Sequence, residues 1–510
     1  MRVSSSALTS AQVALNKPPI WKIVLSRAAA STRGYDNTRV IKISHSETPT
    51  GNTVELVLNN SDGILTSLDF EHYQAVISYG YNTSASRSAR VAASTYAIDD
   101  MVIPPTANGY QYRCSVAGTS GAGTITYPTS LGDTVADSAV TWEMDGNSGE
   151  EYSRAAPLRV RVQELHSGRG ILRCILRPEG ILDQLAEDRA LVAYTQTSAD
   201  TNTVKTLITA VAAATLSSYS GYTAYTVSYD SEDTVISSFI PADYFSVQIN
   251  ENRFEKIQEL LDYTGCKMRI QNDGQPHILD PVVSGTAYNY EYKFNVAGDH
   301  NFWNKTVRLR FVNPNQEIVA SHPDHTPQYS GSATSATSYA LAPKTHTTYR
   351  RLPSNAVASS IASAIIERYE LDAEKGFATV PMNVGQELWD YVKVTDSRQG
   401  DTRTGNIQFL QRNVEVHFDG KPLTWTMMLS FGKVSVLSLM ANMLSAGAGG
   451  AEAIARLTDA QILEMIDALF DNQEILFAND KILDGNIDIL FARETVPKWH
   501  VTEQLIIPVE

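Results

Sequence analysis

An interrupted run of β-strand patterns constrains the fold more than any other feature of this sequence. Apolar and polar side chains alternate before residue 94, as in EHYQAVISYGYN, and again after residue 146, as in APLRVRVQELHSGRGILRCILRP. Such alternation is typical of strands with one buried face. The stretch between them, Ser94 to Gly146, is instead rich in Gly, Thr, Ser and spaced aromatic residues. We therefore expect one sheet that is split by a guest domain.

A guest domain at this place is physically inexpensive. The entropy of closing a loop grows only slowly with its length, and insertions are tolerated mainly at loop tips. We predict a first, split β domain over 1–93 and 147–198, with the guest domain at 94–146.

The rest of the chain predicts three further parts. Helical spacing of Val204, Leu207 and Val211, a second helix in RFEKIQELLDYTG and the hairpin CKMRIQNDGQPHIL predict a helix-on-sheet domain over 199–287. Asp200, Thr201 and Asn202 are candidate N-caps of the first of these helices. Strand patterns return over 288–432 as a second β domain, and a C-terminal extension follows over 433–510.

Composition excludes several classes of function. The formal net charge of −15 argues against nonspecific duplex binding, which depends on Lys and Arg neutralising phosphates. The N-terminal residues lack the apolar core of a secretory signal, and no run of 18 apolar residues predicts a membrane span. The three widely spaced cysteines, Cys114, Cys174 and Cys266, are expected to be buried small hydrophobes in a protein assembled in a reducing compartment.

Two segments and their order resemble the hub protein of phage tail tips and baseplates. The segments are ISHSETPTGNTVELVLNNSDGILTSLDFEHYQAVISYGY and VGQELWDYVKVTD with the helix before it. The likeness covers most of Arg33 to Phe431 apart from the guest domain. It implies two tube-like β-barrel domains per subunit in a mainly β, multidomain fold with α+β parts.

The resemblance also implies a function and partners. Three subunits would present six barrels in a homotrimeric ring that matches a sixfold tail tube and lines or closes the DNA channel. The implied partners are tail-tube and distal tail proteins, tail-fibre or tip proteins, and DNA as passing cargo only. The implied location is the virion tail tip, after assembly in the host cytoplasm. The alternatives are a receptor-binding adhesin and an envelope-digesting enzyme.

The guest domain resembles small β-modules that bind chitin-like chains. The matching residues are Tyr96, Asp100, Val102, Tyr110, Tyr112, Cys114, the AGTSG motif and Val140–Trp142. The resemblance implies host-surface glycan binding, in which an exposed ring stacks on the apolar face of a sugar. Tyr127 and Trp142 are the candidate rings. The alternative is that these aromatic residues form the core of a domain this small, which must bury most of them.

Other reactive clusters have simpler explanations. His322, Asp324 and His325 contain metal-ligand atoms, but a Ser- and Pro-rich loop favours a solvated turn. The paired carboxylates Glu150–Glu151 and Asp99–Asp100 are interpreted as surface charge. No spacing typical of a catalytic triad or phosphate loop is present, so we expect a non-enzyme without a cofactor or metal.

A seven-residue repeat runs through the C-terminal extension and predicts a three-stranded coiled coil. Apolar a positions alternate with mostly polar d positions, and the residues are Ile462, Met465, Leu469, Asn472, Leu476, Asn479, Leu483, Asn486 and Leu490. Polar core residues fix register and oligomer state at a cost in stability. Gly485 weakens the helix, and the alternative is a set of short strands joined by a DGN turn.

Overall fold

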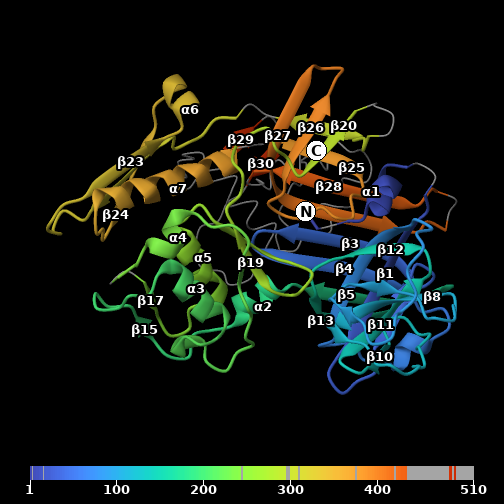
Figure 1. Ribbon diagram of the computed structural model, residues 1–510. Coiled ribbons are helices and arrows are strands. Elements are labelled where there is room, and N and C mark those ends of the chain that lie inside the picture. The colour runs from blue at the N-terminus through green and yellow to red at the C-terminus, as the bar shows by residue number, and fades with distance from the viewer. Residues whose placement is uncertain are drawn as a thin grey trace. The chain divides into compact units, whose positions relative to one another are not determined.

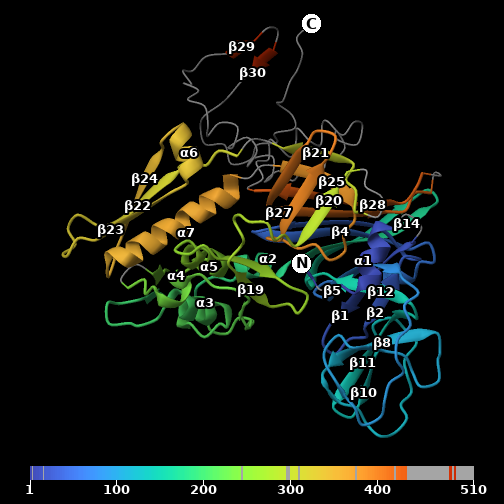
Figure 2. The ribbon, with the colours of Figure 1, turned by 45° about the horizontal axis from the view of Figure 1, so that its top comes forward.

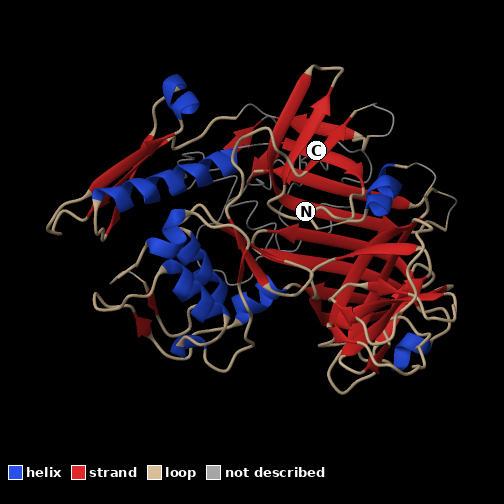
Figure 3. Cartoon of the chain, viewed as in Figure 1, coloured by secondary structure: helices blue, strands red, loops and turns tan. Residues whose placement is uncertain are grey.

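β-Strands dominate the computed structural model of the protein (Figures 1 and 3). It describes residues 1–432 except 3, 15–16, 243–244, 295–298, 308–309, 374–375 and 419–420, together with the backbone of 482–484 and 487–489. Met1–Lys433 is one compact unit and Val434–Glu510 is a second. The prediction of a mainly β, multidomain fold with α+β parts is confirmed.

One 14-stranded sheet runs through the first unit. Its path in order is β2 (Arg33–Asp36), β1 (Pro19–Ser26), β5 (Gln74–Asn82), β13 (Leu158–Gly168), β14 (Ile171–Glu179), β4 (Gly51–Asn59), β3 (Val40–Thr48), β27 (Asp401–Glu415), β28 (Thr424–Phe431), β25 (Gly376–Pro381) and β21 (Asn304–Val307). Three more strands pair beside this path: β12 (Glu150–Arg154) on β5, and β26 (Tyr391–Asp396) between β20 (Tyr290–Lys293) and β27.

The two predicted β domains share this sheet. Strand β3 of the first pairs antiparallel with β27 of the second, from Lys42↔Glu415 to Glu47↔Leu410. Fully buried side chains from both halves, such as Ile23 and Met427, belong to one hydrophobic core. Since this core spans the two domains, the β-rich halves are fused rather than merely linked. Helix α1 (Ser6–Val13) adds Leu8 and Ala11 to the same core.

Residues 83–149, which we call the inserted module, leave and rejoin the sheet at neighbouring positions. Strand β5 ends at Asn82 and β12 begins at Glu150, and these two residues are cross-strand partners. The stretch between them therefore extends beyond the predicted limits of the guest domain. The inserted module has its own sheet of β10 (Thr134–Asp137), β11 (Val140–Asn147), β8 (Tyr110–Val116) and β7 (Met101–Val102), and the strand pair β6 (Thr95–Tyr96) and β9 (Gly118–Thr119). Figure 2 shows β8, β10 and β11 apart from the main sheet.

Helices pack on small sheets in the middle of the chain. The helices are α2 (Ile181–Glu187), α3 (Val204–Ala212), α4 (Thr234–Ser238), α5 (Arg253–Leu261), α6 (Ala336–Leu341) and α7 (Asn355–Ala373), with the 3₁₀ turn η2 (Ser217–Tyr219). A second 3₁₀ turn, η1 (Ile64–Ser67), lies instead between β4 and β5. The sheets pair β15 (Tyr194–Thr195) with β17 (Ser246–Val247), β16 (Ser228–Tyr229) and β18 (Lys267–Ile270) with β19 (Pro276–Leu279), and β23 (Ser330–Thr334) and β24 (Thr345–Arg350) with β22 (Gln316–Ser321).

The core of this middle region differs from the predicted domain limits in one respect. Ile361 of α7, Ile208 of α3 and Ile257 of α5 are all fully buried in one hydrophobic cluster, and α7 contacts α4 of this region directly. Helix α7 thus joins the core of the helix-on-sheet region, although it lies in the sequence of the second β domain. The N-cap of α3 is Thr203, one residue after the predicted candidates.

Candidate functional site

The interior of the inserted module contains the predicted sugar-stacking tryptophan. Trp142 is fully buried, and Tyr96 packs edge-on against it with ring centroids 4.8 Å apart. Its indole Nε1 donates to Asp137 Oδ2 at 2.9 Å, and Arg90 pairs with the same carboxylate. The candidate role of Trp142 in sugar stacking is thereby corrected, because a ring with no exposed face cannot contact a ligand. It is a core residue, as expected for a domain this small.

The second candidate ring, Tyr127, is half-buried. It packs 4.5 Å from Tyr112 between ring centroids, and burial raises the pKa of its phenol to about 12. Its hydroxyl is buried and has no hydrogen-bond partner among the described residues. Tyr127 and Trp142 therefore both contribute to the hydrophobic cluster of the inserted module.

A buried ion pair fastens the inserted module to the main sheet. Lys22 of β1 is 2% exposed, and its Nζ lies 2.7 Å from Asp145 Oδ1 of β11. The same ammonium lies 3.9 Å from the ring centroid of Tyr152 on β12. Burial lowers the pKa of Lys22, and Asp145 opposes that shift. Sequence reasoning missed this contact, although a lysine inside the apolar strand PIWKIVLS was a visible signal.

Next to this ion pair lies a cavity of about 490 Å³, which we call the junction cavity. Its wall includes Arg113 of β8, Arg154 of β12, Arg269 of β18 and Arg2 of the N-terminal segment. Glu151, interpreted from the sequence as surface charge, is 5% exposed and pairs with Arg87 at 2.6 Å. The correction has a physical reason, since alternation along β12 turns this side chain inward.

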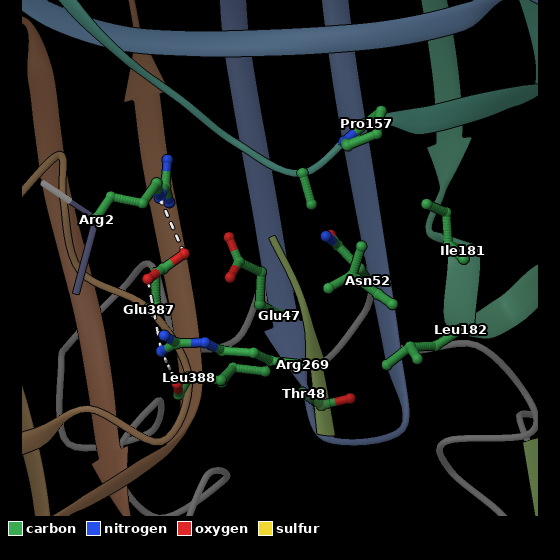
Figure 4. A pocket seen from close by; sticks show the side chains of 12 residues that line it. Arg2, Glu47, Thr48, Asn52, Pro157, Ile181, Leu182, Arg269, Glu387 and Leu388 are labelled. Carbon is green, nitrogen blue, oxygen red and sulfur yellow. Dashed lines mark hydrogen bonds and ion pairs between the residues drawn. The ribbon is translucent and has the colours of Figure 1, made fainter. Parts of the chain in front are cut away.

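A second, smaller cavity of about 30 Å³ adjoins the junction cavity and shares three of its residues, Arg2, Arg269 and Glu387. Figure 4 shows Arg2 and Arg269 on opposite sides of the Glu387 carboxylate, with each ion pair 3.5 Å long. Arg269 also donates to the carbonyl of Leu388 at 3.0 Å. These contacts bind the N-terminal segment and the β18–β19 hairpin to the second β domain.

Beside the smaller cavity, a polar network crosses the interior of the main sheet. Arg412 of β27 is fully buried and pairs with Glu47 of β3. Burial raises the pKa of Glu47, but Arg412, His45 and Arg2 outweigh it and leave that pKa below its usual value. Burial lowers the pKa of His45 to about 4, so the ring is neutral near pH 7 and bridges Tyr79 and Asn52.

The remaining predicted sites lie elsewhere. His322 Nδ1 lies 3.4 Å from Asp324 Oδ2, and both side chains are exposed. Within the described ranges no group of His, Cys, Asp and Glu is arranged to hold a metal ion. All three cysteines are free and buried, as expected. Of the helices that the structure describes, none has the length and apolar character to cross a bilayer.

Part of the predicted coiled coil coincides with strands. Strands β29 (Ile482–Asp484) and β30 (Ile487–Ile489) form an antiparallel pair. Leu483, a predicted a position, thus lies in a strand, as in the alternative of short strands joined by a DGN turn. The other eight heptad positions, Ile462, Met465, Leu469, Asn472, Leu476, Asn479, Asn486 and Leu490, lie outside the described residues.

Comparison with known proteins yields likenesses in structure only. No protein-family profile matches the sequence, and no curated protein matches it. A tail protein from Neisseria meningitidis MC58 superimposes with a TM-score of 0.48 and 9% identity, over 81% of this chain and 96% of that chain. Prophage tail protein gp18 from Listeria monocytogenes EGD-e gives a TM-score of 0.45 and 10% identity, over 83% of this chain and 98% of that chain. The 43 kDa tail protein of prophage MuSo2 from Shewanella oneidensis gives a TM-score of 0.42 and 10% identity, over 81% and 98%.

Proposed function

We propose that the chain is a non-enzymatic structural hub at the tip of a phage-type tail. Three copies form a ring that adapts a sixfold tail tube to a threefold tip and surrounds the path of DNA. The continuous main sheet is the observation that carries this proposal. Pairing of β3 with β27 and the shared core join both β-rich halves into one wall. A fused wall suits a protein that must hold a fixed channel under load.

The hairpin of β13 and β14 supports the assignment to an oligomer. At its end, Leu165 is 48% exposed and Leu172 is 38% exposed on the face that carries Cys174, and Ile171, on the opposite face, is 43% exposed. Leu165 is the cross-strand partner of Cys174, which is fully buried, so the apolar face of the core continues into solvent. Apolar surface gathered in this way is typical of a contact with another protein. We assign this hairpin end to the interface between copies of the chain.

The mass of the full-length purified chain in solution tests the ring. We expect a trimer by native mass spectrometry and by sedimentation, because closed cyclic symmetry lets identical subunits associate without forming open filaments. A monomer at micromolar concentration would contradict the ring.

Particle fractionation separates this proposal from the receptor-binding alternative. A hub stays with the tail tube when fibres are stripped from purified particles, whereas an adhesin leaves with the fibres. The proposed neighbours are therefore tail-tube and distal tail proteins on one side and fibre or tip proteins on the other. The buried position of Trp142 supports the hub over an adhesin that would use this ring.

A further inference from the structure

The junction cavity has the size and the walls of a binding site for a small polar molecule. Its volume of about 490 Å³ falls within the usual range of ligand pockets, about 300–1,000 Å³. The inserted module, strand β12, the N-terminal segment and the β18–β19 turn all contribute to its wall. Ser5, Gln111, Ser153 and Asn272 supply hydroxyl and amide groups there.

Most charges in this wall are already paired. Arg113 lies 2.9 Å from Asp99, Arg87 lies 2.6 Å from Glu151, and Glu387 lies between Arg2 and Arg269. Asp145 is paired with Lys22. Glu150, the remaining carboxylate, accepts from the hydroxyl of Tyr152 and from the side chain of Asn147, each at 2.9 Å. Each of these carboxylates contacts another side chain, and none of the ion pairs or hydrogen bonds among the described residues joins one of them to a further arginine of the wall.

Arg154 is that further arginine. It lies on β12, opposite Ser78 of β5. Lys22 of β1 is opposite the same Ser78 from the other side, so β5 separates the two cations. The hydrogen bonds and ion pairs of the described residues include none from its guanidinium, although the residue is half-buried and lines the cavity. Burial lowers the pKa of Arg154, and the charge of Arg113 lowers it further. Three carboxylates oppose this lowering of the pKa without outweighing it, and they are those of Glu143, Asp145 and Asp99. A half-buried guanidinium next to another cation is costly unless an anion reaches it.

We propose that the junction cavity binds a small hydroxyl-bearing oxyanion, a sugar acid or a sugar phosphate, through Arg154. A planar guanidinium holds a carboxylate or phosphate with two parallel hydrogen bonds. One oxyanion fills a small part of the cavity, and the remaining space is lined by groups that hydrogen-bond to hydroxyls. This proposal does not depend on the trimeric assembly of subunits. It also does not involve Tyr127 or Trp142, the aromatic residues first considered for sugar contact.

Isothermal titration of the full-length chain tests the site with four probes: glucuronate, glucose 6-phosphate, glucose and inorganic phosphate. We expect saturable binding of glucuronate or glucose 6-phosphate and none of glucose, because the charged group supplies the contact with Arg154. Comparison of the first two probes identifies the preferred anion. Absence of binding by both would overturn the proposal. Binding of inorganic phosphate alone would overturn the assignment of a sugar-bearing ligand.

Variants then locate the site. Arg154→Gln should weaken binding by about tenfold or more, since a charge-assisted pair is lost, and Arg154→Lys should weaken it less. Arg177→Gln is the control. Arg177 of β14 is exposed, forms an ion pair of 3.4 Å with Glu164 and is not part of the cavity wall. Met101→Trp leaves Arg154 in the sequence and fills part of the cavity that Met101 lines, so it should weaken sugar binding even if Arg154→Gln fails to fold. Unchanged binding in both Arg154→Gln and Met101→Trp would place the ligand elsewhere.

Discussion

The role of Trp142 follows from its burial. Its ring has no exposed surface, and its indole N–H is hydrogen-bonded to Asp137. We therefore expect Trp142→Ala to destabilise the inserted module by about 3–5 kcal/mol, as is usual for large core aromatics. Trp142→Phe keeps a ring but loses the bond to a carboxylate, and it should cost about 2 kcal/mol. Denaturant unfolding measures both, and an unchanged midpoint for Trp142→Ala would contradict a core role.

Lys22, like Trp142, is buried and is expected to contribute to stability. Removing one partner of a buried ion pair leaves the other unpaired and costs about 3–5 kcal/mol, whereas replacing both partners with apolar groups is nearly neutral. Lys22→Met should thus destabilise the protein strongly, and Lys22→Met with Asp145→Leu should recover most of the loss. Lys42→Met is the matched control, because its partner Glu55 is more exposed and such surface pairs contribute at most about 1 kcal/mol. Thermal unfolding compares the three variants.

Acid should weaken the protein through buried histidine. Burial lowers the pKa of His300 from 6.5 to about 4, while its ring bonds to Tyr290 and Pro381. The unfolded chain takes up this proton near pH 6.5 and the folded chain only near pH 4. The stabilising contribution is therefore complete above pH 6.5 and is lost as pH falls towards 4, up to about 3 kcal/mol. Urea unfolding of wild type and His300→Gln at pH 7 and pH 4.5 should show a smaller pH effect in the variant.

At the scale of elements, substitutions at the end of the β13–β14 hairpin should prevent trimer assembly without unfolding the subunit. Ile171→Asp with Leu172→Asp places charges at the turn end of the hairpin, where the cross-strand partners Gly168 and Ser167 are exposed. We expect the trimer to dissociate into folded monomers, as measured by sedimentation and circular dichroism. Leu341→Asp, at a residue 74% exposed on α6, is the control and should leave the trimer intact. An intact trimer with the hairpin variant would remove this element from the interface.

Individual elements also show how much of the fold can be predicted from local patterns in the sequence. Alternation predicts β4, β5, β13 and β14, and the change in composition indicates the inserted module, because both signals are local. Helix α7 is also expected from the sequence, but its packing on α4 joins segments that lie far apart along the chain, and no local pattern records such a contact. The same limit applies to the junction cavity, whose arginines come from four separate segments.

For the whole molecule, the pairing of β5 with β12 predicts that the inserted module can be removed. Replacing 83–149 with an Asn-Gly turn would join two strands that are already antiparallel neighbours. The shortened chain should fold and assemble, provided that Lys22→Met removes the cation that loses its partner Asp145. Circular dichroism and sedimentation check this, and the same deletion with Lys22 retained should be markedly less stable. Insoluble protein in both would show that the inserted module is integral to the unit.

The adjacent ends of the inserted module also bear on how such a chain can change over time. Since Asn82 and Glu150 are cross-strand partners, a gene segment can be gained, lost or exchanged there without rerouting the surrounding chain. Any domain whose own termini lie about 5 Å apart can be inserted between these two residues. Related proteins can therefore carry different inserted domains at this position while the main sheet stays the same. A foreign domain can also be displayed there by protein engineering.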